Sequence, residues 1–415
     1  MDSVSEVQLI ESSFVVPKDP TPWEGLWLSP LDLVQAKKGH TPVVYLYSSN
    51  NIATADDFFD VVARLKEAMA KALVAFYPLA GRLGVDNHGR VEITCNGEGA
   101  LFVVAHAADL TIGDIKDDFR PSPKLKRLFV PRIEPTSVVL AIQVTFLKCG
   151  GMVLGTALHH VATDALSPFH FLQTWTAFSR HGDCATTVEL PCQDRTPPPC
   201  TVTAYRPPKR LLEDQVVSLK RLCGGTSTFC AISALVWQCT CVARRLPLNS
   251  QACLTFPANV RRRVRPPLPN RYFGNALVRV GVNGAVQDIA SEALASVAGR
   301  IKGAIDGMDD KLVQSAIDYY EMMAMAETDS SQPVKGSNLL ETNLHITSWL
   351  GMPLYDADFG WGKPWVMLAE YNRGGFVHLM SDGPADDASV RVIMCMEAAN
   401  MNELERLIYE KLSSP

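Results

Sequence analysis

The spacing of apolar residues along the first half of the chain predicts a mixture of helices and strands. Between residues 61 and 77, apolar side chains recur every three or four positions, which is typical of an amphipathic helix. Residues 91–95 and 142–146 alternate between apolar and polar side chains, as half-buried strands do. The apolar run at 152–158 is too short for a buried helix and indicates a central strand.

The second half of the chain shows the same mixture. Helical spacing covers residues 227–246, residues 285–305 and the C-terminal stripe at 401–412. Strand patterns cover residues 252–256 and 276–282. Because both halves combine strands with helices, we expect two α/β lobes of similar size.

A proline-rich stretch separates the two halves. Residues 191–208 contain six prolines and almost no periodicity, so this stretch is unsuited to the interior of a sheet. A chain of 415 residues is also longer than one hydrophobic core usually organises. We therefore predict an N-terminal lobe at 1–190, a crossing loop at 191–208 and a C-terminal lobe at 209–415.

Composition and charge narrow the classes of partner. Apolar residues make up 47% of the chain and charged residues 20%, which is enough core material to exclude disorder as the main state. The formal charge of −5 gives no reason to expect binding to nucleic acid or to an anionic membrane. The sequence has no signal-peptide pattern and no apolar run of membrane-spanning length.

The cysteines indicate a reducing compartment. There are eleven, an odd number, and no pair is spaced as Cys-x-x-Cys. Free thiols of this kind are typical of cytosolic proteins. We expect a cytoplasmic monomer with no bound metal and no permanently bound cofactor.

The run from Ala157 to Asp164 carries the strongest chemical signal, because two adjacent histidines stand where a strand is expected to end. Neighbouring residues on a strand point to opposite faces, so His159 and His160 are poorly placed to bind one metal ion. A pair of satisfied core histidines is the plain structural alternative. A histidine that leaves a strand toward a cavity suits general-base catalysis, since its ordinary pKa is about 6.5. Ser167 and Pro168 then resemble a capped helix start.

A second motif runs from Tyr355 to Pro364. Two glycines flank Trp361, which predicts a tight turn, and Asp358 is placed to brace it. The Asp-Phe-Gly triplet inside this motif also occurs in protein kinases, but the glycine-rich loop and the His-Arg-Asp loop of kinases are missing. Taken alone, the motif indicates a structural loop.

Taken in this order, the two motifs resemble the His-x-x-x-Asp and Asp-Phe-Gly-Trp-Gly signatures of the plant BAHD acyltransferases. The resemblance extends over nearly the whole chain. Further matches are Leu28-Ser-Pro-Leu-Asp32, residues 76–83, Ser227-Thr-Phe, residues 261–269, Tyr272-Phe-Gly-Asn275 and Thr347-Ser-Trp349. Thr347-Ser-Trp349 together with the second motif is most similar to the branch that transfers hydroxycinnamoyl groups.

The resemblance implies two chloramphenicol-acetyltransferase-like lobes with a solvent channel between them. An acyl-CoA thioester would be the cosubstrate, entering from one face while the acceptor enters from the other. His160 would be the general base, and the resemblance suggests Trp361, Trp349 or Thr347 as polar groups near the reacting atoms. It gives Asp164 an architectural role, paired with Arg261 or Arg263, and Asp358 a structural one.

The resemblance also assigns binding residues. It places Ser227, Thr228, Arg261, Arg263, Ser348 and Trp349 on the side of the coenzyme or the acyl group, and Thr347, Gly351 and Lys335 on the side of the acceptor. The family's usual glycine after Asp164 is Ala165 here, so the turn must accept a side chain.

The acceptor side departs from the family's shikimate-using members. Lys335 and Gly351 stand where those relatives carry two arginines, and lysine cannot form the planar two-pronged pair with a carboxylate. We therefore expect hydroxycinnamoyl transfer to an amine, either a polyamine or an aryl amine, with acidic residues at 318–321 or at Asp356 holding its charged end. Transfer to shikimate or quinate is the alternative, and a non-catalytic binding protein on the same fold is a third.

Overall fold

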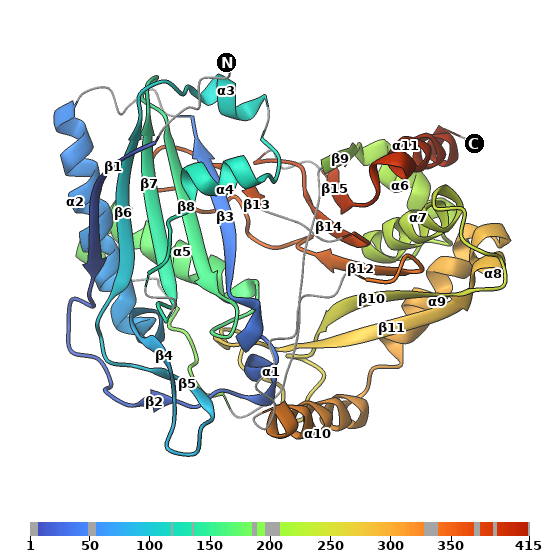
Figure 1. The fold of residues 1–415 in the computed structure, drawn as a ribbon, viewed down its shortest axis with the longest axis horizontal. Coiled ribbons are helices and arrows are strands. Elements are labelled where there is room, and N and C mark those ends of the chain that lie inside the picture. The colour runs from blue at the N-terminus through green and yellow to red at the C-terminus, as the bar shows by residue number, and fades with distance from the viewer. Residues whose placement is uncertain are drawn as a thin grey trace.

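The computed structural model describes residues 7–48, 55–117, 119–134, 137–184, 189–195, 208–327, 339–368, 374–384 and 388–413. Two six-stranded sheets stand beside each other, each with its own helices (Figure 1). This arrangement confirms the expected α/β fold of two lobes. Among the described residues, no helix has the length and apolarity needed to cross a bilayer.

The first sheet contains β8, the strand that ends at the residue before His160. Its strands, in spatial order, are β1 (Gln8–Val15), β6 (Ala100–Ala107), β7 (Leu140–Leu147), β8 (Met152–His159), β3 (His40–Tyr47) and β13 (Trp365–Leu368). The helices α2 (Ala55–Ala75) and α5 (Leu166–His181) pack together on one face, and α4 (Pro123–Phe129) lies on the other (Figure 1). Strand β8 lies inside the sheet and every one of its residues is buried, as the apolar run at 152–158 predicts.

The second sheet has the strand order β11 (Leu277–Ala285), β10 (Gln251–Asn259), β12 (Asn343–Ser348), β14 (Phe376–Ser381), β15 (Val390–Cys395) and β9 (Pro208–Leu211). Its apolar core is formed with the helices α6 (Glu213–Leu222), α7 (Thr228–Ala243), α9 (Leu294–Asp306) and α11 (Ala398–Ser413). Helix α7 is almost wholly buried, which explains why its sequence is apolar on all sides.

The remaining elements are short or peripheral. The helices are α1 (Pro30–Leu33), α3 (Ile112–Lys116), α8 (Val286–Ser291) and α10 (Asp310–Glu327), with 3-10 turns η1 (Ala36–Lys38), η2 (Tyr77–Ala80) and η3 (Gly182–Cys184). A third, three-stranded sheet has the order β2 (Gly25–Leu26), β5 (Val91–Thr94), β4 (Arg82–Val85).

Two helix predictions need correction. The single helix expected at 285–305 is two helices, α8 and α9, because the buried Gln238 side chain donates to the carbonyls of Ile289 and Glu292 at the break, at 2.7 and 3.0 Å. Helix α5 begins at Leu166, whereas the sequence predicted Ser167 as its cap and Pro168 as its first residue. The Leu166 N–H donates to the Asp164 carboxylate at 3.2 Å, so the turn before the helix satisfies its first backbone N–H.

The division of the chain into two lobes is less clean than the sequence predicts. Residues 349–368, expected in the C-terminal lobe, contribute Trp349, Phe359 and Leu368 to the first core. Strand β13 then pairs with β3 and covers what would be an open sheet edge. Most of the expected crossing loop, residues 196–207, lies outside the described residues.

Candidate active site

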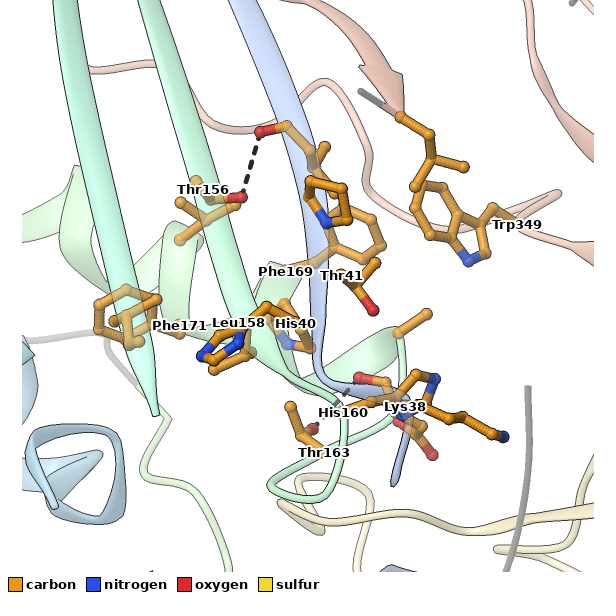
Figure 2. Close-up of a pocket in the computed structure, with 18 of the residues that line it drawn as sticks. Lys38, His40, Thr41, Thr156, Leu158, His160, Thr163, Phe169, Phe171 and Trp349 are labelled. Atoms are coloured by element: carbon orange, nitrogen blue, oxygen red, sulfur yellow. Dashed lines mark hydrogen bonds between the residues drawn. The ribbon is translucent and has the colours of Figure 1, made fainter. Parts of the chain in front are cut away.

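A cavity of about 350 Å³ lies between the two sheets (Figure 2). The first sheet and α5 form most of its wall, and the second sheet closes the other side. Lining residues from the first lobe include Lys38, His40, Tyr45, Ile142, Leu158, His160, Phe169 and Phe171, and those from the second include Pro257, Leu277, Thr347 and His378. The family resemblance implies a solvent channel between the lobes, and this cavity lies between them.

His160 is brought to the cavity wall by the end of β8. Its backbone N–H donates to the Gly39 carbonyl at 2.9 Å, which ties the end of β8 to the residue before β3. His159 is 6% exposed and does not line the cavity. Its Nδ1 accepts from the Val161 N–H at 3.3 Å, and its ring stands edge-on to His40. The two histidines therefore have different surroundings, as expected for neighbours on a strand.

The imidazole of His160 is neutral at physiological pH. Burial, and to a smaller extent the positive charge of Lys38, lower its pKa to about 4. The nearby Asp164 and Asn275 side chains oppose this shift more weakly. A neutral ring on a cavity wall is able to accept a proton from a bound molecule.

Asp164 is an anchor for the turn that follows His160. Its carboxylate accepts two hydrogen bonds from the Arg261 guanidinium, at 2.7 and 3.0 Å, and a third from the Ala276 N–H at 3.0 Å. Arg261 also donates to the carbonyls of Tyr272 and Gly274. Both side chains are buried, and they join the first lobe to the second.

A second buried network supports the same turn. Asp32 accepts from the backbone N–H and the side-chain amide of Asn275, at 3.0 and 2.8 Å, and pairs with Arg195. The Asn275 amide also donates to the His160 carbonyl at 3.1 Å. Asp32 and Asn275 each belong to a matched motif, but nothing in their local sequence indicates that they meet.

The Asp-Phe-Gly-Trp-Gly loop has the predicted turn but lies far from His160. One oxygen of Asp358 accepts from the N–H groups of Gly360 and Gly362, at 2.8 and 2.9 Å, and both glycines have positive φ. The ring of Trp361 stands edge-on to Tyr47, with 5.8 Å between centroids. Tyr47 pairs with Met152, which lies seven residues before His159 in β8. At the rise of a β-strand, this separation is about 23 Å along the strand. Trp361 therefore lies toward the other end of β8 from His160 and does not line the cavity, and we do not propose it for the reacting atoms.

The transferase family model matches residues 5–199 and 209–411 of this chain. Putrescine hydroxycinnamoyltransferase 1 of Oryza sativa subsp. japonica is 37% identical over 98% of this chain and 99% of that protein. The chain belongs to the transferase family, the BAHD acyltransferases.

Two further relatives act on different acceptors. Hydroxycinnamoyl-CoA:5-hydroxyanthranilate N-hydroxycinnamoyltransferase HHT4 of Avena sativa is 34% identical over 96% of this chain and 98% of its own. Shikimate O-hydroxycinnamoyltransferase of Nicotiana tabacum is 33% identical over 98% of this chain and 100% of its own. The crystal structure of vinorine synthase has the same fold, with a TM-score of 0.77 and 22% identity over 98% of both chains. The protein is thus an acyltransferase, as the two signatures predict.

The residues that the family resemblance assigns to the coenzyme or the acyl group are only partly at the cavity. Trp349 lines it, edge-on to Phe169 and to His378. Ser348 and Thr228 do not line it, and Ser227 caps α7 by accepting from the Cys230 N–H. Arg261 is the partner of Asp164, whereas Arg263 donates to the Met308 carbonyl at 2.7 Å. Arg261 is therefore not available for the coenzyme phosphates.

Of the described residues assigned to the acceptor, one lines the cavity and one does not. Thr347 lines the cavity, but Gly351 does not, and its φ of +73° is one that glycine adopts easily. Lys335 lies outside the described residues. Lys38, His40 and His378 also line the cavity, and their neighbours in sequence carry no chemical signature that would predict this. Within the described ranges, no three acidic, histidine or cysteine side chains gather as a metal site would require.

Proposed function

We propose that this acyltransferase moves a hydroxycinnamoyl group from its CoA thioester to an amine, with His160 as the general base. The observation that carries the proposal is the neutral His160 ring on the wall of a largely apolar cavity between the lobes. The 37% identity to a putrescine hydroxycinnamoyltransferase supports the acyl donor and the amine.

The cavity suits an aromatic acyl group. Its apolar lining includes Leu140, Ile142, Leu158, Phe169, Phe171 and Leu172. Such walls bind a planar ring and keep water from the thioester. We place the acyl chain along this wall and the thioester carbonyl near His160.

In the proposed reaction, His160 accepts one proton from the acceptor and later donates it to the leaving group. The nitrogen lone pair of the acceptor attacks the thioester carbonyl, and the carbonyl oxygen becomes an oxyanion. His160 takes the proton that the nitrogen loses, the carbon–sulfur bond breaks, and the proton passes to the leaving thiolate. Thr347 and Trp349, which line the cavity from the second lobe, are the side-chain donors that we propose for the oxyanion.

The surroundings of the cavity favour an aryl amine over a polyamine. The acidic residues expected to hold a charged amine are elsewhere: Glu321 pairs with Arg90 at 2.7 Å, and Asp356 lies near Lys363 at the surface. An aryl amine arrives as the free base. An alkyl amine, with a pKa near that of lysine at about 10.4, arrives protonated and has first to lose that proton.

Transfer to shikimate or a related acid is the second candidate. Lys38 supplies a cation at the cavity, and the tobacco shikimate enzyme is 33% identical. Lysine attracts a carboxylate as a point charge without the bidentate geometry of arginine.

An acceptor panel tests the proposal. With p-coumaroyl-CoA as donor, we expect thiol release and amide formation with anthranilate, at higher kcat/KM than with tyramine, putrescine or shikimate. Mass spectrometry of each product distinguishes amide from ester. Efficient ester formation on shikimate with no amide from any amine would contradict the amine proposal and establish the second candidate.

The acid limb of the pH profile provides a further prediction. Because the pKa of His160 is lowered to about 4, the imidazole stays neutral down to that pH. We expect kcat/KM for an aryl amine to be level between about pH 6 and 8 and to fall only as the pH drops toward about 4. Circular dichroism at each pH controls for unfolding. A limb at the ordinary histidine value of about 6.5 would show that His160 is solvated in the free enzyme.

A further inference from the structure

One face of the second sheet continues outward from the cavity along β10 and β11. Pro257 and Leu277 line the cavity, and Arg279 pairs directly with Pro257 across the two strands. Thr255 pairs with Gly281 two positions farther along. Residues two apart on a strand share a face of the sheet, as directly paired residues do, so all five lie on the cavity side. The two strands run side by side from the first lobe toward α8, so this face leads out of the cavity (Figure 1).

The part of this face formed by Thr255, Arg279 and Gly281, here called the outer strip, is open to solvent. Arg279 and Gly281 are exposed, and Thr255 is half-buried. A Cβ atom at Gly281 would lie 4.0 Å from its nearest neighbours, the Sγ of Cys253 and the Cγ2 of Thr255, so the surface is low there. A narrow, unbranched chain that leaves the cavity therefore has room to lie along the outer strip.

Arg279 places a positive charge on the outer strip. Within the described ranges, no carboxylate forms an ion pair with its guanidinium and no protein group accepts a hydrogen bond from it. Burial, and to a smaller extent the charge of Arg279, lower the pKa of His345 to about 3. The same charge opposes the increase that burial causes in the pKa of Cys253. The guanidinium is therefore close to groups of β10 and β12 on the sheet and has donors open to a ligand.

The arginines that the family resemblance assigns to the coenzyme are held by protein groups. Arg261 donates to the carboxylate of Asp164 and to two backbone carbonyls. Arg263 donates to the Met308 carbonyl. Arg279 differs from both, because it lies beside the cavity and its guanidinium is not engaged by the protein.

We propose that Arg279 binds a phosphate group of the acyl-CoA donor. With the thioester at His160, the pantetheine arm of the coenzyme follows the outer strip, and a phosphate group reaches the guanidinium. A guanidinium pairs with phosphate through two parallel hydrogen bonds, which select both charge and orientation. This inference rests on the proposed function, because it takes an acyl-CoA as the donor and places its thioester at His160.

The test compares p-coumaroyl-CoA with p-coumaroyl-pantetheine, which keeps the thioester and the arm but has no phosphate. Thiol release with the best acceptor gives kcat and KM for both donors in the wild type, Arg279→Gln and Arg279→Lys. For Arg279→Gln we expect kcat/KM with p-coumaroyl-CoA to fall by about tenfold to hundredfold, the range of a hydrogen bond to a charged group. The loss should be in KM, because a contact far from the reacting atoms is the same before and during the reaction.

The second donor and the second variant sharpen this result. In Arg279→Gln, kcat/KM with p-coumaroyl-pantetheine should stay unchanged, because this donor has no group for the guanidinium to bind. Arg279→Lys keeps the charge without the two-pronged geometry and should lose less than Arg279→Gln with p-coumaroyl-CoA. Equal losses with both donors in Arg279→Gln would assign Arg279 to the fold or to the reacting atoms and would overturn the inference. So would an undiminished kcat/KM with p-coumaroyl-CoA.

Arg221→Gln is the matched control. Arg221 is an exposed arginine of α6, and α6 packs with Leu254 and Phe256 on the opposite face of the second sheet. The variant removes the same charge from the same lobe, away from the outer strip. It should leave kcat and KM unchanged with both donors.

A third donor distinguishes the two kinds of phosphate in the coenzyme. The dephospho-CoA thioester keeps the diphosphate and lacks the 3′-phosphate. If Arg279 binds the diphosphate, Arg279→Gln loses as much with this donor as with p-coumaroyl-CoA. If it binds the 3′-phosphate, the wild type already shows the loss with this donor and Arg279→Gln adds nothing. Either result supports the inference and identifies the phosphate.

Failure of the proposed function gives a different result. Calorimetric titration with CoA alone requires neither an acceptor nor a reaction. If no amine is acylated while CoA binds the wild type about tenfold to hundredfold more tightly than Arg279→Gln, the acceptor assignment is wrong and the inference holds. A Kd for CoA that is the same in both proteins would overturn the inference, whichever acceptor is used.

Discussion

Replacement of His160 by alanine is expected to lower kcat/KM by about 10²–10⁴-fold, the usual contribution of a general base. The variant loses the only proton acceptor that we place at the thioester. Because the His160 side chain lines an existing cavity, its removal enlarges that cavity rather than opening one inside a packed core, and should change the melting temperature little. Thiol release with p-coumaroyl-CoA and the best acceptor measures the loss.

His159→Ala is the matched control. It removes an imidazole from the adjacent position, where the ring is buried away from the cavity and accepts from the Val161 N–H. We expect it to cost stability more than rate. If His160→Ala keeps more than about a tenth of the wild-type rate, the loss is below the range of a general base and the assignment is wrong.

Arg261→Ala is expected to destabilise the protein by about 3–5 kcal/mol, because it leaves the buried carboxylate of Asp164 uncompensated. Asp164 is 2% exposed and takes two of its hydrogen bonds from this guanidinium. Asp164→Asn removes the negative charge of the pair and leaves the Arg261 guanidinium uncompensated. It should therefore also lower the melting temperature and the yield of folded protein. Thermal unfolding and urea titration measure both effects.

Two further variants separate architecture from chemistry. Arg262→Ala, at an exposed neighbouring position, should leave stability unchanged. The double variant Asp164→Asn with Arg261→Ala should be more stable than the sum of the two single losses predicts, because neither charge is then left unpaired. An Asp164→Asn protein with an unchanged melting temperature and a collapsed rate would instead place Asp164 in the chemistry.

The partner of Asp164 and the place of Trp361 have one physical cause, which is contact between segments far apart in the sequence. The sequence left Arg261 and Arg263 as equal partners for Asp164, since both lie in one basic cluster. Packing of the second lobe decides between them: Arg261 turns inward to Asp164, and Arg263 donates to the Met308 carbonyl. In the same way, pairing of β13 with β3 carries Trp361 to the far end of the first sheet.

The sequence by itself determined the features that depend on near neighbours. The period of apolar residues predicted α2, β7 and β8, and the glycines around Trp361 predicted a turn with positive φ, because side-chain periodicity and backbone freedom are local properties. The two signatures also identified the family. Only the tertiary structure decided what surrounds His160. Lys38, Asn275 and Thr347 reach its neighbourhood from separate elements, so the charge of the cavity and the pKa of the base depend on how the two lobes pack.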